Sequence, residues 1–408
     1  MNKKKIINDP VHGFITIPSE FIFDLIEHPY FQRLRRIRQL GLAQYVYPGA
    51  VHTRFHHAIG AMHITQIAIE TLRNKGHEIS ATEEEAVSAA ILLHDIGHGP
   101  FSHALEHTLV AHLKHEEISM MIMEKINESM GGALNMAIEI FKNVYPKKFL
   151  HQLVSSQLDM DRLDYLARDS FFTGVSEGII SSERILKMLN VFDDKLVIDA
   201  KGIYSVEKFI VARRLMYWQV YLHKTVLAAE NQLINTLKRA RYLTAKGHDL
   251  FGTKSFKILL KNNFTSKDFK QQPHLIDEFC LLDDFDIFTS IKEWMTHDDF
   301  ILSHLCKGLI DRNLFKIKLQ EKSFTQQETE NYLKKAVKAY NITEEEASSL
   351  AFTGKIENSA YTKSQENINI LFKDNVIKDI ADASDNLSIS ALSKPVVKHY
   401  LCVDSGCL

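Results

Sequence analysis

The sequence has few cysteines, no long apolar run and no excess of charge of either sign. Its four cysteines, among 408 residues, all lie in the second half of the chain and are too few for a disulfide framework. No apolar stretch reaches the roughly 18 to 20 residues that a membrane span requires. The N-terminus also lacks the apolar segment of a signal peptide. We therefore expect a cytoplasmic protein without a membrane partner.

The charges are balanced, with 49 Lys and Arg against 51 Asp and Glu. Such a chain has no overall attraction to nucleic acid, so no stable nucleic-acid partner is expected. Any affinity for phosphate must come from local clusters of basic side chains. The length and the 45% hydrophobic content allow a large buried core.

Histidine is unevenly distributed, because 13 of the 20 histidines fall within residues 1–115. Structural histidines would be expected to scatter along the chain. Imidazole is a frequent metal ligand and a proton donor near neutral pH. The N-terminal third is therefore the first place to look for a site.

Helical periodicity dominates the first 250 residues, and β-structure is sparse. A capping box, Thr82 with Glu85, is expected to open an apolar helix that runs to Leu93. The other predicted elements are helices at 54–72, 155–168 and 206–241 (the last broken in two), a strand at 13–17 and a hairpin of 195–199 with 202–205.

The character of the chain changes beyond residue 245, where histidines become rare. Short alternating runs predict strands at 314–319, 368–372 and 399–403, and a charged helix is predicted at 326–339. We therefore predict a mainly α core over residues 1–250 and a smaller C-terminal α+β lobe over residues 251–408.

The densest group of chemically active side chains lies between Leu92 and His103. The apolar helix delivers His94 and Asp95 at its C-terminal end, and Gly97 allows the backbone to turn there. Adjacent helix residues point about 100° apart, so one ion can bind both only from an irregular turn. A nitrogen beside a carboxylate suits Fe, Mn, Zn or Ni. A surface His–Asp pair at a helix end is the alternative.

Two protein ligands rarely hold a catalytic metal, so further ligands are needed. His57 stands at the start of a predicted helix, and Asp161 belongs to a helix rich in carboxylates. On that helix Asp161, Asp164 and Tyr165 share a face. Asp164 is also spaced to form an ion pair with Arg168, which is the structural interpretation of that aspartate. A His, His-Asp, Asp set leaves coordination positions open, as a hydrolase requires.

The order His57, His94-Asp95 and Asp161 resembles the H…HD…D signature of HD-domain phosphohydrolases. Further segments resemble the dNTP triphosphohydrolase branch of that family, and the resemblance runs over residues 5–240. These segments are Asn8–Gly13, Phe31–Arg35, Gln39–Gly41, Tyr47–Gly49, Arg54–His57 and the block around Asp161. The resemblance implies an HD-domain helical core with short β-hairpins.

The resemblance also implies a metal site and a reaction. The expected metal ligands are His57, His94, Asp95 and Asp161. Family enzymes cut dNTPs to a deoxynucleoside and inorganic triphosphate by attack of water at the α-phosphorus. His98, His103 and His115 would lie over the α-phosphate. His115, supported by Glu106, would protonate the departing 5′-oxygen. An ordinary polar histidine on a helix is the alternative for His103 and His115.

The substrate contacts implied by the resemblance fall into two groups. Arg54, Arg162 and Arg213 would hold the triphosphate, to which arginine donates paired hydrogen bonds. Gln39 and Asp169 would read the sugar 3′-hydroxyl, with Leu40 beside them. Tyr165 and Tyr221 would pack against the sugar, Tyr165 leaving no room for a 2′-hydroxyl. Ordinary salt bridges or core aromatic contacts are the alternative for each of these residues.

The sequence departs from the family pattern in two places. Tyr217 stands where the family has a histidine near the phosphates, which bears on substrate range. The regulatory nucleotide site of the family is matched only in part, by Lys5, Asn8, Glu27 and Arg35. A solvated helix face with ion pairs is the alternative for the arginine-rich segment 33–38.

These patterns predict hydrolysis of dNTPs by an HD-type phosphohydrolase. A divalent metal would occupy the His/Asp site and Mg would accompany the nucleotide. The family habit predicts a homodimer or homotetramer and a possible nucleotide activator. The alternatives are an HD phosphohydrolase acting on another nucleotide or a phosphomonoester, and a non-catalytic nucleotide sensor. A sensor would be expected to lose a metal ligand, and all four are retained.

Overall fold

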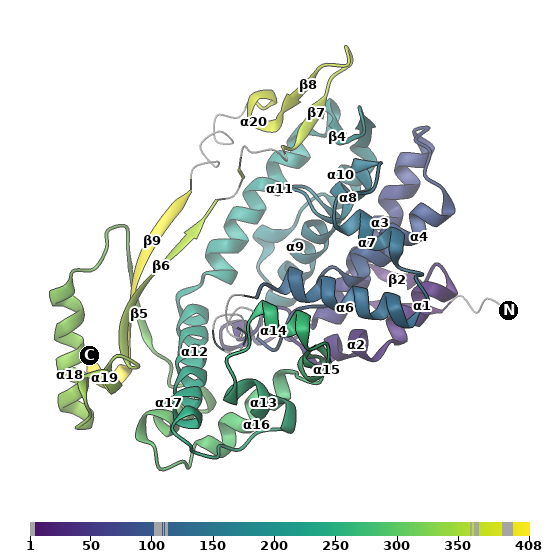
Figure 1. Cartoon of the computed structure of the whole chain (residues 1–408). Coiled ribbons are helices and arrows are strands. Elements are labelled where there is room, and N and C mark those ends of the chain that lie inside the picture. The colour runs from purple at the N-terminus through teal and green to yellow at the C-terminus, as the bar shows by residue number, and fades with distance from the viewer. Residues whose placement is uncertain are drawn as a thin grey trace.

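The computed structural model describes residues 5–101, 108, 110, 113–359, 361–362, 367–385 and 395–408. The fold is mainly α, and the short strands within these residues gather in three small sheets (Figure 1). This confirms the predicted fold class. No helix within the described ranges is both long enough and apolar enough to cross a membrane.

The N-terminal part is a helical core preceded by one hairpin. Its elements are β1 (Ile6–Asp9), β2 (Gly13–Thr16), α1 (Glu20–Glu27), α2 (Pro29–Gln32), α3 (Arg54–Asn74), α4 (Ala81–Leu93), α6 (His115–Ser129), α7 (Asn135–Phe141), α8 (Lys148–Val154), α9 (Met160–Thr173), α10 (Ser182–Met188), β3 (Leu189–Phe192), β4 (Lys195–Asp199), α11 (Ile203–Met216) and α12 (Lys224–Ala245).

The site is built on helices α3, α4 and α9. Helix α3 packs against both α4 and α9, so side chains from all three can meet. Residues 86–93 of α4 are all buried, and burying a Leu or Ile side chain contributes about 1.5–3 kcal/mol. A rigid apolar helix thus carries the polar turn that follows it.

Three local expectations were wrong in detail. Helix α4 is capped by Ser80 with Glu83, two residues before the expected Thr82 pair, because Ser80 Oγ accepts from Glu83 N. Helix α9 begins after Asp159, whose carboxylate caps it, rather than at residue 155. The hairpin pairs β3 with β4, and residues 203–205 instead open α11.

The turn chemistry explains the misplaced hairpin. Asp193 and Asp194 have φ values of 49° and 56°, the left-handed pair that a two-residue hairpin turn needs. Asp tolerates this region better than most residues. The predicted break in the long helix is confirmed, because a π-helical segment, Tyr217–Tyr221, separates α11 from α12.

The C-terminal part mixes helices with strands. Its elements are α13 (Lys254–Lys261), α14 (Ser266–Gln271), α15 (His274–Cys280), α16 (Asp284–Trp294), α17 (Phe300–Ile310), β5 (Lys316–Gln320), α18 (Gln326–Tyr340), α19 (Glu344–Ala347), β6 (Ala351–Asn358), β7 (Asn369–Leu371), β8 (Ile377–Asp379), α20 (Ile380–Ala383) and β9 (Val396–Val403).

Two sheets organise this part of the chain. Strands β5, β9 and β6 form an antiparallel sheet with α18 packed on one face, on the opposite side of the view from the β1–β2 hairpin (Figure 1). Strand β7 pairs in parallel with β4 and antiparallel with β8. The late segment 369–379 therefore joins a sheet begun by the N-terminal part. The division at residue 250 remains a prediction.

Candidate active site

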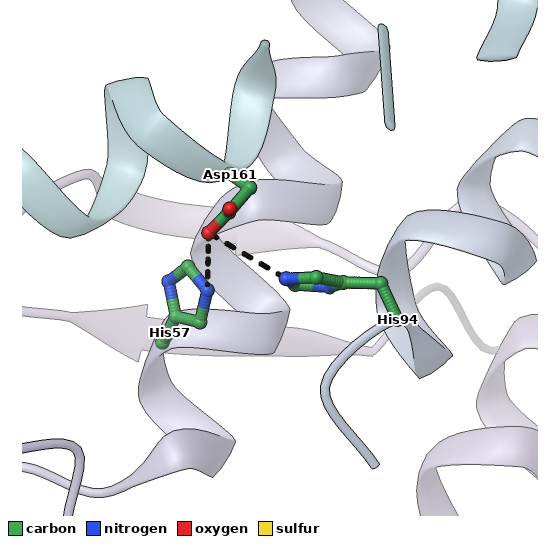
Figure 2. Close-up of side chains that lie close together, drawn as sticks. All are labelled: His57, His94 and Asp161. Carbon is green, nitrogen blue, oxygen red and sulfur yellow. Dashed lines mark ion pairs between the residues drawn. The ribbon is translucent and has the colours of Figure 1, made fainter. Parts of the chain in front are cut away.

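Three side chains converge at the meeting point of α3, α4 and α9. His57 lies near the start of α3, His94 follows the last residue of α4, and Asp161 lies in the first turn of α9. Asp161 Oδ1 is 3.0 Å from His57 Nε2 and 3.5 Å from His94 Nε2 (Figure 2). One ligand atom from each residue lies within 4.8 Å of the other two, which suits a single metal ion.

The opposite nitrogen of each imidazole is held by a hydrogen bond. His57 Nδ1 donates to Asp164 Oδ2 at 2.8 Å, and His94 Nδ1 donates to the carbonyl of Ile91 at 2.6 Å. Both Nε2 atoms are buried, and each faces the Asp161 carboxylate rather than a backbone partner. Such second-sphere contacts fix the ring and the tautomer of a metal-ligating histidine. The two Nε2 atoms are therefore aimed at a common point.

Asp164 supports His57 and is itself held by several hydrogen bonds. It accepts two hydrogen bonds from Arg168, at 2.9 Å each, so the predicted ion pair is confirmed. It also accepts from His12 at 2.6 Å, while Arg168 reaches Asp9 at 2.8 Å. A Cβ atom at Gly60 would come within 2.1 Å of the Asp164–Arg168 pair, so only glycine admits this close approach of α9 to α3.

Asp95 lies beside the three converging residues. Its carboxylate is 3.4 Å from His94 Nε2, 3.9 Å from His57 Nε2 and 2.6 Å from Arg54 Nη1. Asp95 also forms a second potential metal-binding group with His98 and His115. The structure thus brings the four predicted ligands together, with Asp95 turned toward the arginine.

The turn that carries His94 and Asp95 is held by Ser119, which the sequence did not single out, and by Arg33 of the arginine-rich segment. Ser119 Oγ donates to the His94 carbonyl and accepts from Gly97 N. The fully buried Arg33 donates to the carbonyls of Ile96 and His98. A Cβ atom at Gly97 would lie 2.2 Å from the His115 carbonyl, so this glycine permits the close packing of α6 on the turn.

The electrostatics of the cluster favour a cation. Burial opposes charge on His57, but the carboxylates of Asp161 and Asp164 raise its pKa to about 10. Burial likewise opposes charge on Asp161, but the His57 and His94 imidazoles hold its pKa below the ordinary value. Positive charge is thus stabilised between these groups, either as a proton on His57 or as a divalent ion that replaces it. The donor set of imidazoles and carboxylates fits a borderline divalent metal.

A pocket of about 570 Å³ opens over the cluster. Burial and the charge of Arg54 lower the pKa of His98, at its floor, to about 3, so this imidazole is neutral at physiological pH. The His115 ring stacks on that of His98, with centroids 3.8 Å apart. Residues predicted from the sequence that line the pocket are Gln39, Leu40, Arg54, Asp95, His98, His115, Asp161, Arg162, Tyr165, Asp169, Arg213 and Tyr221.

The pocket wall carries hydrogen-bond donors that lack a partner. The Nε atoms of Arg162 and Arg213 are buried and make no hydrogen bond to any described residue, while Arg162 Nη1 lies 3.5 Å from Asp159 and 3.7 Å from Asp161. Leaving such a donor unsatisfied costs about 1–3 kcal/mol. An anion bound in the pocket would recover that free energy.

Other predicted residues lie elsewhere. His103 and Glu106 fall outside the described residues. Lys5 lies over the Phe23 ring, and Arg35 lies over the Phe55 ring and donates to Gln32. Neither Lys5, Asn8, Glu27 nor Arg35 lines the pocket.

The arginines of segment 33–38 make different kinds of contact. Arg33 is buried against the metal-site turn, and Arg36 forms an ion pair with Asp283. These two arginines are therefore structural. Pocket residues that sequence reasoning missed include Val226 and Glu230 on α12, since nothing in the local pattern of a long helix marks which turn faces a pocket.

Comparison with known proteins shows which family this chain resembles. The HD domain family matches residues 54–169, and the HD associated region matches residues 180–248. The crystal structure of a phosphohydrolase (BT4208) from Bacteroides thetaiotaomicron is similar, with a TM-score of 0.95 and 52% identity. The similarity covers 98% of this chain and 100% of that one.

Two curated relatives extend the comparison. An uncharacterized protein of Bacillus subtilis, YwfO, is 36% identical over 78% of this chain and 72% of its own length. The deoxynucleoside triphosphate triphosphohydrolase SAMHD1 homolog of Dictyostelium discoideum is 30% identical over 65% of this chain. This chain spans only 55% of that relative's length.

The chain belongs to the HD-domain family of phosphohydrolases. Its relatives include proteins named deoxynucleoside triphosphate triphosphohydrolases, at about 30% identity.

Proposed function

We propose that the protein hydrolyses deoxynucleoside triphosphates to a deoxynucleoside and inorganic triphosphate. The observation that carries the proposal is a single pocket with a metal-type cluster at its floor and unsatisfied arginine donors on its wall. A nucleotide triphosphate offers ligands to both. The relatives named as deoxynucleoside triphosphate triphosphohydrolases support this substrate class.

His57, His94, Asp95 and Asp161 would hold the divalent metal, expected to be Fe, Mn, Zn or Ni. Such an ion supplies Lewis-acid catalysis and an activated water to a phosphate ester. Mg would accompany the triphosphate, as it does in most nucleotide sites.

The protein's own residues would position the substrate and move the proton. Arg54, Arg162 and Arg213 bind the phosphate chain, so that the α-phosphorus lies over the cluster. Water forms a bond to that phosphorus while the bond to the 5′-oxygen breaks. His115, stacked on the neutral His98, would donate the proton that the departing oxygen takes up. His103 and Glu106 remain proposed members of this group.

The sugar end of the pocket is formed by aromatic and polar side chains. The Tyr165 and Tyr221 rings meet edge to face, with centroids 6.2 Å apart. We propose that Tyr165 excludes a 2′-hydroxyl, and that Asp169 and Gln39 accept or donate hydrogen bonds at the 3′-hydroxyl, with Leu40 beside the sugar. Tyr217 adds a second phenol near Tyr221 (5.1 Å), where the family has a histidine.

Regulation and assembly are also proposals. Lys5, Asn8, Glu27 and Arg35 are candidates for binding a nucleotide activator, in a homodimer or homotetramer. A cytoplasmic location also remains a proposal, based on the few scattered cysteines of the sequence.

One assay tests the proposed function. Purified protein is incubated with each dNTP and each NTP in the presence of Mg or Mn, and the products are separated by anion exchange. We expect inorganic triphosphate and deoxynucleoside in equal amounts from dNTPs. Release of phosphate or pyrophosphate instead would favour a different HD phosphohydrolase, and no turnover would favour a nucleotide sensor.

A further inference from the structure

A hydrogen-bonded chain runs from the pocket wall into the protein interior. The Tyr221 hydroxyl donates to Asp169 Oδ2 at 2.7 Å, and His52 Nε2 donates to Asp169 Oδ1 at the same distance. Asp169 and Tyr221 line the pocket, whereas His52 lies behind them with a fully buried side chain. Each oxygen of the carboxylate is therefore held by one donor.

The His52 ring is itself fixed by stacking. It lies on the Phe172 ring, with centroids 4.4 Å apart and an interplanar angle of 17°. Phe172 and Asp169 belong to the same helix, α9, so the stack and the hydrogen bond orient the imidazole from one rigid element. The Nε2 atom consequently has one direction in which to donate.

The backbone of His52 holds Gln39, a second residue that lines the pocket. Its carbonyl accepts from Gln39 N at 3.0 Å, next to an antiparallel bridge between Arg38 and Thr53. This short ladder sets where the Gln39 side chain enters the pocket. The Oε1 atom of Gln39 is buried and makes no hydrogen bond to any residue the structure describes.

We propose that His52 is a positioning residue for recognition of the sugar 3′-hydroxyl, through Asp169 by its side chain and through Gln39 by its backbone. The inference rests on the proposed function. A carboxylate whose two oxygens are already anchored keeps one orientation and still has lone pairs for a substrate hydroxyl. If the His52 donor is lost, Asp169 can rotate and its preference for a 3′-hydroxyl weakens.

The chain offers a matched control among residues that do not line the pocket. His304 Nε2 donates to Asp404 at 2.9 Å, the Tyr340 hydroxyl donates to the other Asp404 oxygen, and His304 stacks on Phe300. This is the same Tyr–Asp–His arrangement on an aromatic ring, but none of these residues lines the pocket. Loss of His304 should therefore report the structural cost alone.

The test compares kcat/KM for a dNTP with that for the corresponding 2′,3′-dideoxynucleoside triphosphate, which lacks the 3′-hydroxyl. His52→Phe keeps a ring on Phe172 but removes the donor, and we expect the preference for the dNTP to fall about tenfold, the size of one hydrogen bond to a charged group. The fall should appear as a higher KM for the dNTP only. His52→Gln, whose amide can donate to Asp169, should restore most of the preference. His304→Phe should not change it.

The outcomes separate the inference from the function on which it rests. If wild type releases no triphosphate from any dNTP, the proposed function and the role of His52 are both rejected, and no variant needs to be compared. If wild type is active and His52→Phe loses activity equally on both nucleotides, His52 is merely structural and the inference alone fails. Should the Phe variant not fold, as judged by its thermal unfolding, His52→Ala is compared in the same way and has the same two outcomes.

Discussion

Two regions of the pocket stabilise charges of opposite sign. We call the metal-type cluster with Asp95 and Asp161 the floor, and the side with Arg162 and Arg213 the wall. At the floor, Asp95 and Asp161 face two imidazoles, and the pKa of His57 is raised because positive charge is stabilised there. On the wall, Arg162 and Arg213 have buried N–H groups without a partner, and these favour an anion. A free metal satisfies only the floor and a free phosphate only the wall. The difference supports the proposal that a metal and a polyphosphate complete the two halves together.

The contacts that support the residues of the floor and of the wall also differ. The metal-site histidines are locked by Asp164 and the Ile91 carbonyl, and the turn that carries them by Ser119 and Arg33. By contrast, the Arg213 guanidinium lies 5.9 Å from the Tyr217 ring, and its buried Nε makes no hydrogen bond to a described residue. We infer that the floor is preorganised, whereas Arg213 on the wall is ordered by substrate.

Removing a floor ligand should have the largest effect. His94→Ala is expected to lose stoichiometric metal and to lower turnover at least about 100-fold, since even outer-sphere partners of a metal typically contribute 10–100-fold. Elemental analysis and the triphosphate assay measure the two effects, with His304→Ala as the control histidine. A variant that keeps both its metal and its activity would show that His94 is not a ligand.

Removing a wall arginine should weaken substrate binding without affecting metal binding. Arg213→Ala is expected to raise KM for a dNTP by about 10–100-fold, because a hydrogen bond to a charged group is worth about 1.5–3 kcal/mol. The metal content should not change. Arg214→Ala, at a neighbouring residue that does not line the pocket, is the matched control. Loss of metal from the Arg213 variant would contradict the independence of floor and wall.

The sugar preference should depend on the bulk of Tyr165. Wild type should prefer a dNTP over the NTP by well over tenfold, and Tyr165→Ala should narrow that preference by about tenfold, or 1.4 kcal/mol. Tyr165→Phe keeps the ring and should keep most of the preference. Equal turnover of the dNTP and the NTP by wild type would reject the steric role of Tyr165.

The smallest expected effect concerns regulation. If Lys5 and Arg35 bind an activating nucleotide, one dNTP should stimulate hydrolysis of another at least about fivefold, the lower end of typical allosteric coupling. Arg35→Ala should remove the stimulation, which initial rates on mixed nucleotides would measure. Hyperbolic kinetics for every mixture would leave Arg35 as part of a charged surface.

The sequence predicted which residues gather at the candidate site better than it predicted the scaffold that holds them. His57, His94, Asp95 and Asp161 could be found because the residue types and their local context resemble a known motif. The capping position of α4 and the hairpin at β3–β4 were misplaced because neighbouring residues offered competing local signals, with Ser80 against Thr82 and Asp193 against Ala200.

The supporting contacts could not be predicted from local patterns. Asp164 meets His12 across 152 positions, and Arg168 meets Asp9 across 159. Arg33 looked like one of a surface group of arginines but is fully buried against the metal-site turn. Such contacts depend on how distant elements pack, and a single sequence does not encode them in any local periodicity.

Hydrolysis in water enriched in ¹⁸O tests the central claim most directly. Wild-type protein with its metal is given a dNTP, and both products are analysed by mass spectrometry. If water attacks the α-phosphorus held between floor and wall, one ¹⁸O atom will appear in the inorganic triphosphate and none in the deoxynucleoside. Label in the deoxynucleoside, or release of a nucleoside monophosphate with pyrophosphate, would contradict the account.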